Sequence, residues 1–150
     1  MKHIAVIPGD GIGKEVIAAG MDVLEAVSQI SSFQFEPEYV DIGSERYLRT
    51  GELLTDADID LLKSKDAIYF GAIGDPRVKP GVLEQGILLK MRAVFDQYIN
   101  LRPVTSWFPL VPLKREVPFD IHFLRENTED FYMGAGGDFG PSYGDTAELH

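Results

Sequence analysis

Arg92 and Arg102 have the residue type and the surroundings to bind carboxylates. The guanidinium group is planar and offers paired N–H donors, which suits two-pronged recognition of a carboxylate. Three- and four-residue steps place Arg92 on one face of a predicted helix with Gln85, Leu88 and Leu89. A guanidinium and an amide beside two leucines would suit a small acid with an apolar branch. Most helix arginines only form surface ion pairs, so residue type alone leaves both interpretations open.

The segments that carry these arginines are predicted to differ in backbone structure. Before Asn100, apolar residues recur at helical steps and are expected to form one buried stripe: Ile87, Met91, Val94 and Tyr98. Pro103 disfavours helical backbone at Arg102, so the chain should be extended there. A third arginine, Arg125, follows a strand predicted over residues 120–124. Each arginine therefore lies at or near the end of a predicted element.

The first part of the chain alternates between predicted strands and helices. Apolar runs predict strands at residues 4–7, 33–40 and 67–70, with helical patterns between them and a capping-box-like start at Thr55 and Asp58. The short continuous runs are typical of buried parallel strands. This order predicts an α/β fold with a parallel sheet flanked by helices. In such a fold the loops at the carboxyl ends of the strands usually bind the ligand.

A glycine-rich turn, residues 8–13, follows the first predicted strand. A loop of this kind before a helix can bind phosphate through its backbone N–H groups. Its spacing fits neither the G-x-G-x-x-G fingerprint nor a P-loop, so we do not predict an ordinary Rossmann nucleotide site. A purely structural turn is an equally good interpretation.

Composition limits the classes of partner. The chain has 150 residues, no cysteine and a formal net charge of −10. This length suits a single globular domain, and without cysteine neither disulfides nor thiolate metal sites are available. The acidic excess argues against broad binding of nucleic acid or an anionic membrane. Because no apolar run suits a signal peptide or a membrane span, we expect a cytoplasmic protein.

Five motifs occur in one order over most of the chain: Ile7–Gly13, Gly71–Pro76, Leu88–Arg92, Asn100–Pro103 and Leu124–Glu129. In these motifs the chain resembles the β-decarboxylating dehydrogenases, the family of 3-isopropylmalate, isocitrate, homoisocitrate and tartrate/D-malate dehydrogenases. The resemblance implies the isopropylmalate/isocitrate dehydrogenase-like fold, which is not a Rossmann fold. It also implies that residues 1–103 form the N-terminal half of a large domain and residues 104–150 the truncated start of a smaller one.

The resemblance implies roles for particular residues in substrate binding and proton transfer. Arg92, Arg102 and Arg125 are similar to the arginines that hold the malate carboxylates in this family. Tyr132 is similar to the tyrosine that protonates the enolate carbon after decarboxylation. Leu88 and Leu89 are apolar where an isopropyl group would lie.

A second group of residues is similar to those that contact NAD. Ile12 resembles a residue on the adenosine side, and the loop 74–85 resembles the one that covers the nicotinamide side. The cofactor contacts expected from the resemblance are Ile12, Ile73, Gly74, Asp75 and Gln85. The choice between NAD and NADP is left open by these residues.

The resemblance implies oxidative decarboxylation of a 2-hydroxy acid with NAD and Mg²⁺ or Mn²⁺ by a homodimer whose site the second subunit completes. Family members are more than twice this length, so we interpret the chain as an N-terminal piece that is inactive alone. The catalytic lysine and the metal-binding aspartates are expected outside it. Asp138 and Asp145 are interpreted as turn residues in a glycine-rich loop.

Several functions remain open. Leu88 and Leu89 favour 3-isopropylmalate, and Gly86 stands where a serine is usual in the isocitrate branch, which argues against isocitrate. The combination of Leu88–Arg92 with residues 95–98 also resembles the tartrate/D-malate branch. Hypotheses of another class are a catalytically silent regulatory subunit and a small acid-binding module.

Overall fold

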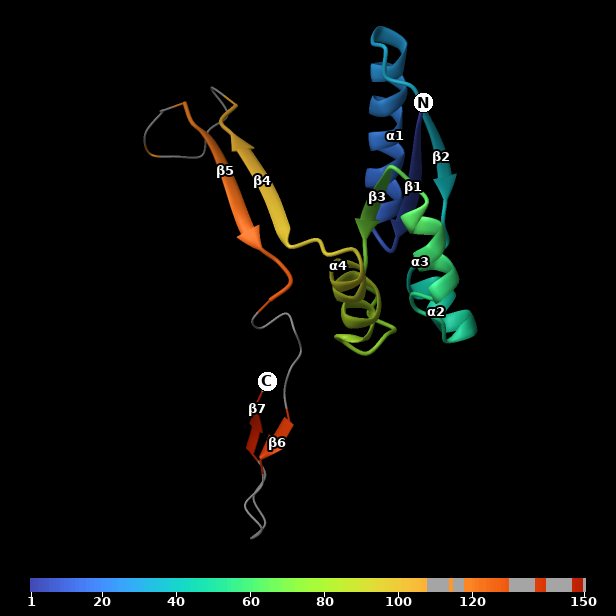
Figure 1. The fold of residues 1–150 in the computed structure, drawn as a ribbon, viewed down its shortest axis with the longest axis vertical. Coiled ribbons are helices and arrows are strands. Elements are labelled where there is room, and N and C mark those ends of the chain that lie inside the picture. The colour runs from blue at the N-terminus through green and yellow to red at the C-terminus, as the bar shows by residue number, and fades with distance from the viewer. Residues whose placement is uncertain (108–113, 115–117, 130–136, 140–146, 150) are drawn as a thin grey trace. The chain divides into compact units, whose positions relative to one another are not determined.

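The computed structural model describes residues 1–107, 114, 118–129, 137–139 and 147–149 (Figure 1). The chain divides into two compact units, Met1–Phe95 and Asp96–His150. The division precedes the boundary expected after Pro103, which lies inside a strand of the second unit. The assignment of the two parts to a large and a smaller domain stays a prediction.

The first unit is a three-stranded parallel sheet with helices, as the sequence predicts. Its strand order is β2-β1-β3, with β1 in the centre. The elements run in the order β1 (Lys2–Gly9), α1 (Gly13–Ile30), β2 (Phe35–Tyr39), α2 (Ser44–Thr50), α3 (Asp56–Lys63), β3 (Ala67–Ala72), the π-helix η1 (Glu84–Leu89) and α4 (Lys90–Val94).

The central strand β1 is buried on both faces of the sheet. Successive side chains of a strand point to opposite faces, so its apolar run supplies two separate clusters. Ala5 and Ile7 pack in one cluster with residues of α3, η1 and α4. Ile4 and Val6 pack in the other with Ile17 and Met21 of α1. Burial of each large apolar side chain in this way stabilises the folded state by roughly 1.5–3 kcal/mol.

Local signals in the sequence set the ends of two helices. Thr55 accepts a hydrogen bond from the backbone N–H of Asp58, and the Asp58 carboxylate accepts one from the Thr55 N–H, so the predicted capping box begins α3. Helix α2 ends at Gly51, whose φ of 76° is left-handed and whose N–H donates to the Tyr47 carbonyl.

The segment that carries Arg92 differs from the predicted helix. Its fully buried stripe consists of Leu83, Ile87 and Met91, whereas Val94 is 37% exposed and Tyr98 is 55% exposed and outside the helix. The four-residue steps of this stripe suit the wider turn of a π-helix. The helix ends because Asp96 has a φ of 49°, which turns the chain out of the helical path.

In the second unit two pairs of antiparallel strands are described. Strands β4 (Ile99–Thr105) and β5 (Asp120–Glu126) pair along their whole length, with Asn100 opposite Arg125. Strands β6 (Gly137–Phe139) and β7 (Ala147–Leu149) form the other pair. Among the described residues, no helix combines the length and the apolar character needed to cross a membrane.

Candidate active site

The turn after β1 and the loop after β3 lie side by side at the carboxyl edge of the parallel sheet. The Asp10 N–H donates to the Ala72 carbonyl (2.6 Å), and the Gly74 N–H donates to the Asp10 carboxylate (3.1 Å). Four of the residues predicted to contact NAD are carried by these two segments: Ile12, Ile73, Gly74 and Asp75. This is the edge where the sequence predicts the ligand.

Two of the three glycines in the first turn are required by close packing, whereas Gly11 has open space beside it and a φ of 49°, which favours glycine. A Cβ atom at Gly9 would lie 2.1 Å from the Ala72 carbonyl oxygen, and one at Gly13 would lie 2.3 Å from the Pro8 carbonyl oxygen. Neither position can hold a side chain unless the backbone moves. This structural reason explains why the turn is rich in glycine although it lacks a phosphate-binding fingerprint.

Asp75 is fixed by the side chain of Arg77. Its Oδ1 accepts hydrogen bonds from the Arg77 N–H (2.8 Å) and Nε (3.0 Å), and Arg77 also forms an ion pair with Glu45. The hydrogen bonds from Arg77 hold the pKa of Asp75 well below its usual range. Asp75 is therefore ionised and anchors its loop, while its contact with NAD stays a prediction.

Three of the residues predicted to contact NAD are exposed: Ile12, Gly74 and Gln85. Ile12 is 67% exposed directly before α1, although isoleucine is usually buried. A Cβ atom at Gly74 would meet nothing within 4 Å, so there is open space above this loop. Gln85 is exposed on η1. An exposed apolar side chain can pack against one face of an aromatic ring such as those of NAD.

The described residues do not fit a catalytic metal on their own. Among them, no three His, Asp or Glu side chains gather closely enough to hold an ion. Mg²⁺ and Mn²⁺ prefer several oxygen ligands in a near-octahedral array. The expectation that the metal ligands lie outside this chain stays a prediction.

Arg92 and the two leucines predicted to contact substrate lie on η1 and α4. Leu88, Leu89 and Arg92 are each half-buried, so part of every side chain is open to solvent. Lys90 donates from Nζ to the Leu54 carbonyl (2.8 Å), which directs this cation to the protein and not to a ligand. The helix thus presents two apolar side chains and one guanidinium together.

Arg102 and Arg125 lie on the same face of the β4–β5 ribbon. Asn100 is directly opposite Arg125, and residues two apart on a strand share a face, so Arg102 joins them. Arg102 Nε donates to Asn100 Oδ1 (2.9 Å), and Arg125 Nη2 donates to Asn127 Oδ1 (2.9 Å). Two guanidinium groups are thus held by asparagine side chains on one face. Arg92 belongs to the first unit, and its convergence with this pair stays a prediction.

Glu126 has a structural role after β5. Its Oε1 accepts hydrogen bonds from the backbone N–H of Thr128 (2.6 Å) and of Glu129 (3.0 Å). Those hydrogen bonds keep the pKa of Glu126 below its ordinary value. Since adjacent strand residues face opposite sides, the carboxylate serves the turn and not the arginine face. Tyr132, the predicted proton donor, lies outside the described residues.

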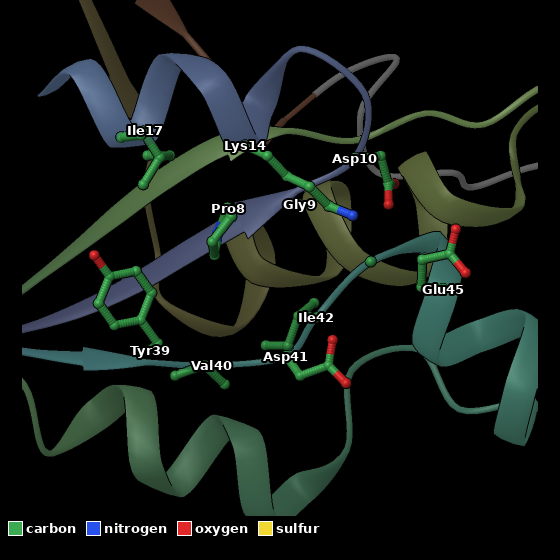
Figure 2. A pocket seen from close by; sticks show the side chains of 12 residues that line it. Pro8, Gly9, Asp10, Lys14, Ile17, Tyr39, Val40, Asp41, Ile42 and Glu45 are labelled. Carbon is green, nitrogen blue, oxygen red and sulfur yellow. The ribbon is translucent and has the colours of Figure 1, made fainter. Parts of the chain in front are cut away.

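Figure 2 shows a pocket of about 410 Å³ between the start of α1 and the end of β2. Its lining includes Lys14 as the sole cation beside three carboxylates, those of Asp10, Asp41 and Glu45. An acidic rim of this kind is poorly suited to a polyphosphate. None of the residues predicted from the sequence to bind substrate or cofactor lines this pocket, and it depends on packing that no local signal reveals.

A family model described as isocitrate/isopropylmalate dehydrogenase matches residues 3–146, so the chain belongs to this family. A 3-isopropylmalate dehydrogenase from Streptomyces coelicolor is 52% identical over 137 residues, covering 90% of this chain and 39% of that protein. One from Bifidobacterium longum is 48% identical over 135 residues, covering 89% and 39%. The chain thus spans about two fifths of the length of these curated relatives.

Solved structures agree with this fold. An isocitrate dehydrogenase from Methylococcus capsulatus matches with a TM-score of 0.78 at 24% identity, over 99% of this chain and 42% of that one. A β-decarboxylating dehydrogenase from Thermococcus kodakarensis matches with a TM-score of 0.65 at 27% identity, over 99% and 40%. The predicted family and fold class are confirmed, and the protein is related to decarboxylating dehydrogenases.

Proposed function

We propose that the whole protein carries out the NAD-dependent oxidative decarboxylation of a 3-substituted malate, namely 3-isopropylmalate. The observation that carries this proposal is the pair of guanidinium groups, Arg102 and Arg125, on one face of the β4–β5 ribbon. The names of the relatives from Streptomyces and Bifidobacterium support the same substrate.

The arginines bind and orient the substrate. A substituted malate has two carboxylates, and each can accept two parallel N–H donors from one guanidinium. Held in this way, the hydroxyl-bearing carbon keeps a fixed position, which removes much of the entropic cost of reaching the transition state. Asn100 and Asn127 hold Arg102 and Arg125 in place before the substrate arrives.

Leu88 and Leu89 supply the apolar side of the proposed site, next to Arg92. Their half-buried side chains leave apolar surface that an isopropyl group could cover, and covering it would remove apolar area from water. NAD, when bound, would supply the acceptor for the hydride of the hydroxyl-bearing carbon, and the hydroxyl proton would pass to the catalytic lysine expected outside this chain. Tyr132 then donates its phenolic proton to the carbon that has lost CO₂, as a general acid.

Isocitrate is disfavoured because Gly86 stands where the isocitrate branch usually has a serine. A Cβ atom there would lie 2.3 Å from Leu53 Cδ1 and 3.3 Å from Leu53 Cβ, so a serine would need Leu53 to move. Tartrate or D-malate remains an alternative substrate, since neither needs the leucines. A silent regulatory subunit would keep the fold but need no proton donor. The homodimer and the cytoplasmic location expected from the sequence stay predictions.

The proposal is tested by turnover of the full-length protein. NADH formation would be followed by absorbance with NAD, Mg²⁺ or Mn²⁺, and 3-isopropylmalate, D-malate, D-tartrate or isocitrate in turn. We expect the highest kcat/KM with 3-isopropylmalate. A preference for D-malate or tartrate would select the alternative substrate, and absence of turnover with all four acids would support a silent subunit.

A further inference from the structure

Asp10 is a buried acidic residue in the turn between β1 and α1, and the proposed contacts with substrate and cofactor do not use it. It is only 4% exposed. Its Oδ1 accepts hydrogen bonds from the backbone N–H of Ser44 (2.8 Å) and from Ser44 Oγ (2.6 Å), and its Oδ2 accepts one from the Gly74 N–H (3.1 Å). One carboxylate therefore joins the turn after β1, the start of α2 and the loop after β3.

Ser44 places a second carboxylate next to this link. Its Oγ is 3.0 Å from Asp75 Oδ2 as well as 2.6 Å from Asp10 Oδ1. A hydroxyl has a single proton to donate, and Asp10 is the nearer acceptor. Asp75 already receives hydrogen bonds from Arg77. The serine hydroxyl is thus available to Asp10, while Arg77 balances the charge of Asp75.

The backbone at Gly43 leaves room for the Asp10 carboxylate. A Cβ atom at Gly43 would lie 2.8 Å from Asp10 Oδ1, which is closer than such atoms approach. Gly43, Ser44 and the Gly74 N–H therefore enclose the carboxylate from two segments that are far apart in the sequence. No local sequence pattern singles out Asp10 or Ser44, because their partners become neighbours only in the folded sheet.

We infer that Asp10 is a positioning residue for the cofactor, an inference that rests on the proposed function, in which Ile12 and Gly74 contact NAD. Ile12 follows Asp10 in the same turn, and the Gly74 N–H is held by the Asp10 carboxylate. The link fixes the separation of these two segments before NAD binds. Less conformational freedom is then lost on binding, which raises the affinity.

The test uses Asp10→Asn in the full-length protein. Asparagine keeps the volume and can still accept from Ser44, but its NH₂ group cannot accept the Gly74 N–H. Loss of this bond should raise the Kd for NAD, measured by calorimetry on the substrate-free protein, about tenfold. The kcat and the KM for the 2-hydroxy acid should change less than about twofold. The backbone amides in residues 73–77, which exclude that of Pro76 because proline has no N–H, should exchange hydrogen faster without NAD.

The matched control is Asp66→Asn. Asp66 also accepts a backbone hydrogen bond across the same sheet, from the His3 N–H (2.8 Å), and pairs with Lys2, but it lies before β3 at the other end of the strand. The control should leave the Kd for NAD and the exchange of residues 73–77 unchanged. This control distinguishes a specific effect on the turn after β1 and the loop after β3 from a general loss of stability.

The outcomes separate this inference from the proposed function. If wild-type protein binds NAD and Asp10→Asn binds it equally well, even with faster exchange in residues 73–77, Asp10 serves only the fold and the inference is overturned. If Asp10→Asn does not fold, Ser44→Ala replaces it: a rise in Kd supports the inference and an unchanged Kd overturns it. If wild-type protein does not bind NAD, the proposed function fails and the inference fails with it.

Discussion

Arg46 and Asp58 form a two-pronged ion pair that links α2 to α3. Arg46 Nη1 and Nη2 donate to the two Asp58 oxygens at 2.9 and 2.5 Å, and the side chains are only 11% and 12% exposed. Burial by itself raises the pKa of Asp58, but hydrogen bonds from Arg46 and Thr55 outweigh it and lower the pKa to about 2. Asp58 therefore stays ionised at neutral pH.

The lowered pKa of Asp58 predicts a pH-dependent contribution to stability. Because the folded-state pKa lies below the ordinary value of 3.8, the stabilisation is fully present above pH 4 and is lost as the pH falls through about 2. It amounts to about 2 kcal/mol. Urea unfolding of Asp58→Asn should show this loss in the free energy of unfolding at pH 7 and a smaller one near pH 2.

Asp60→Asn is the control for this measurement, since Asp60 is exposed on the same helix. It should change the free energy of unfolding by no more than about 0.5 kcal/mol at any pH. A difference between wild type and Asp58→Asn that does not vary with pH would show that the ion pair is not the cause.

Leu88 is predicted to set the preference for an apolar substrate branch. In the full-length enzyme, Leu88→Asn should lower kcat/KM for 3-isopropylmalate more than for D-malate, because the amide replaces the apolar surface that the isopropyl group covers. The change in discrimination should be about 1–3 kcal/mol. The matched Leu48→Asn, on an exposed leucine of α2, should change neither value. Equal losses on both substrates would make Leu88 a packing residue.

At the scale of elements, the π-helix η1 and α4 show where sequence patterns reach their limit. The spacing of apolar residues indicates a helix with Ile87 and Met91 buried, and both are. The same spacing extends the stripe to Val94 and Tyr98, but Val94 is exposed at the last position of α4 and the turn at Asp96 takes Tyr98 out of the helix. Whether a helix continues or turns is decided by tertiary packing, which the periodicity does not contain.

The buried stripe of Leu83, Ile87 and Met91 predicts which substitutions lower the free energy of unfolding. Ile87 is fully buried in the larger core cluster, which also holds residues of β1 and α3, so Ile87→Ala should lower the free energy of unfolding by about 2–5 kcal/mol. Val94→Ala, at a position the original stripe treats as equivalent, should cost less than about 1 kcal/mol. Denaturant unfolding measures both variants. Equal losses of unfolding free energy in the two variants would show that Val94 contributes to the core as much as Ile87 does.

Other elements were predictable for reasons that are local in the sequence. The apolar run of β1 identifies a strand buried on both faces, and Thr55 with Asp58 identifies the start of α3. The arginine motifs point to Arg102 and Arg125, and the pairing of β4 with β5 places both on one face. The contacts of Asp10 with Ser44 and Gly74 were not predictable, because hydrogen bonds between distant loops leave no periodic pattern.

At the scale of the whole molecule, the acidic excess does not create a metal site in the described residues. The net charge is −10, yet several of the carboxylates are in ion pairs, among them those of Asp58, Asp66 and Asp75. We therefore predict that the 150-residue chain alone shows no saturable binding of Mn²⁺ in calorimetry and no turnover with NAD. Saturable binding to one site would mean that residues 1–150 supply the ligands.

The claim that the whole protein is an oxidative decarboxylase is tested most directly by the ratio of CO₂ to NADH formed from 3-isopropylmalate. Both products would be measured in one reaction of the full-length protein with NAD and a divalent metal. Because the proposed reaction transfers one hydride and releases one carboxyl group per turnover, we predict equal amounts of the two products. NADH formed without CO₂, or neither product formed, would contradict the account.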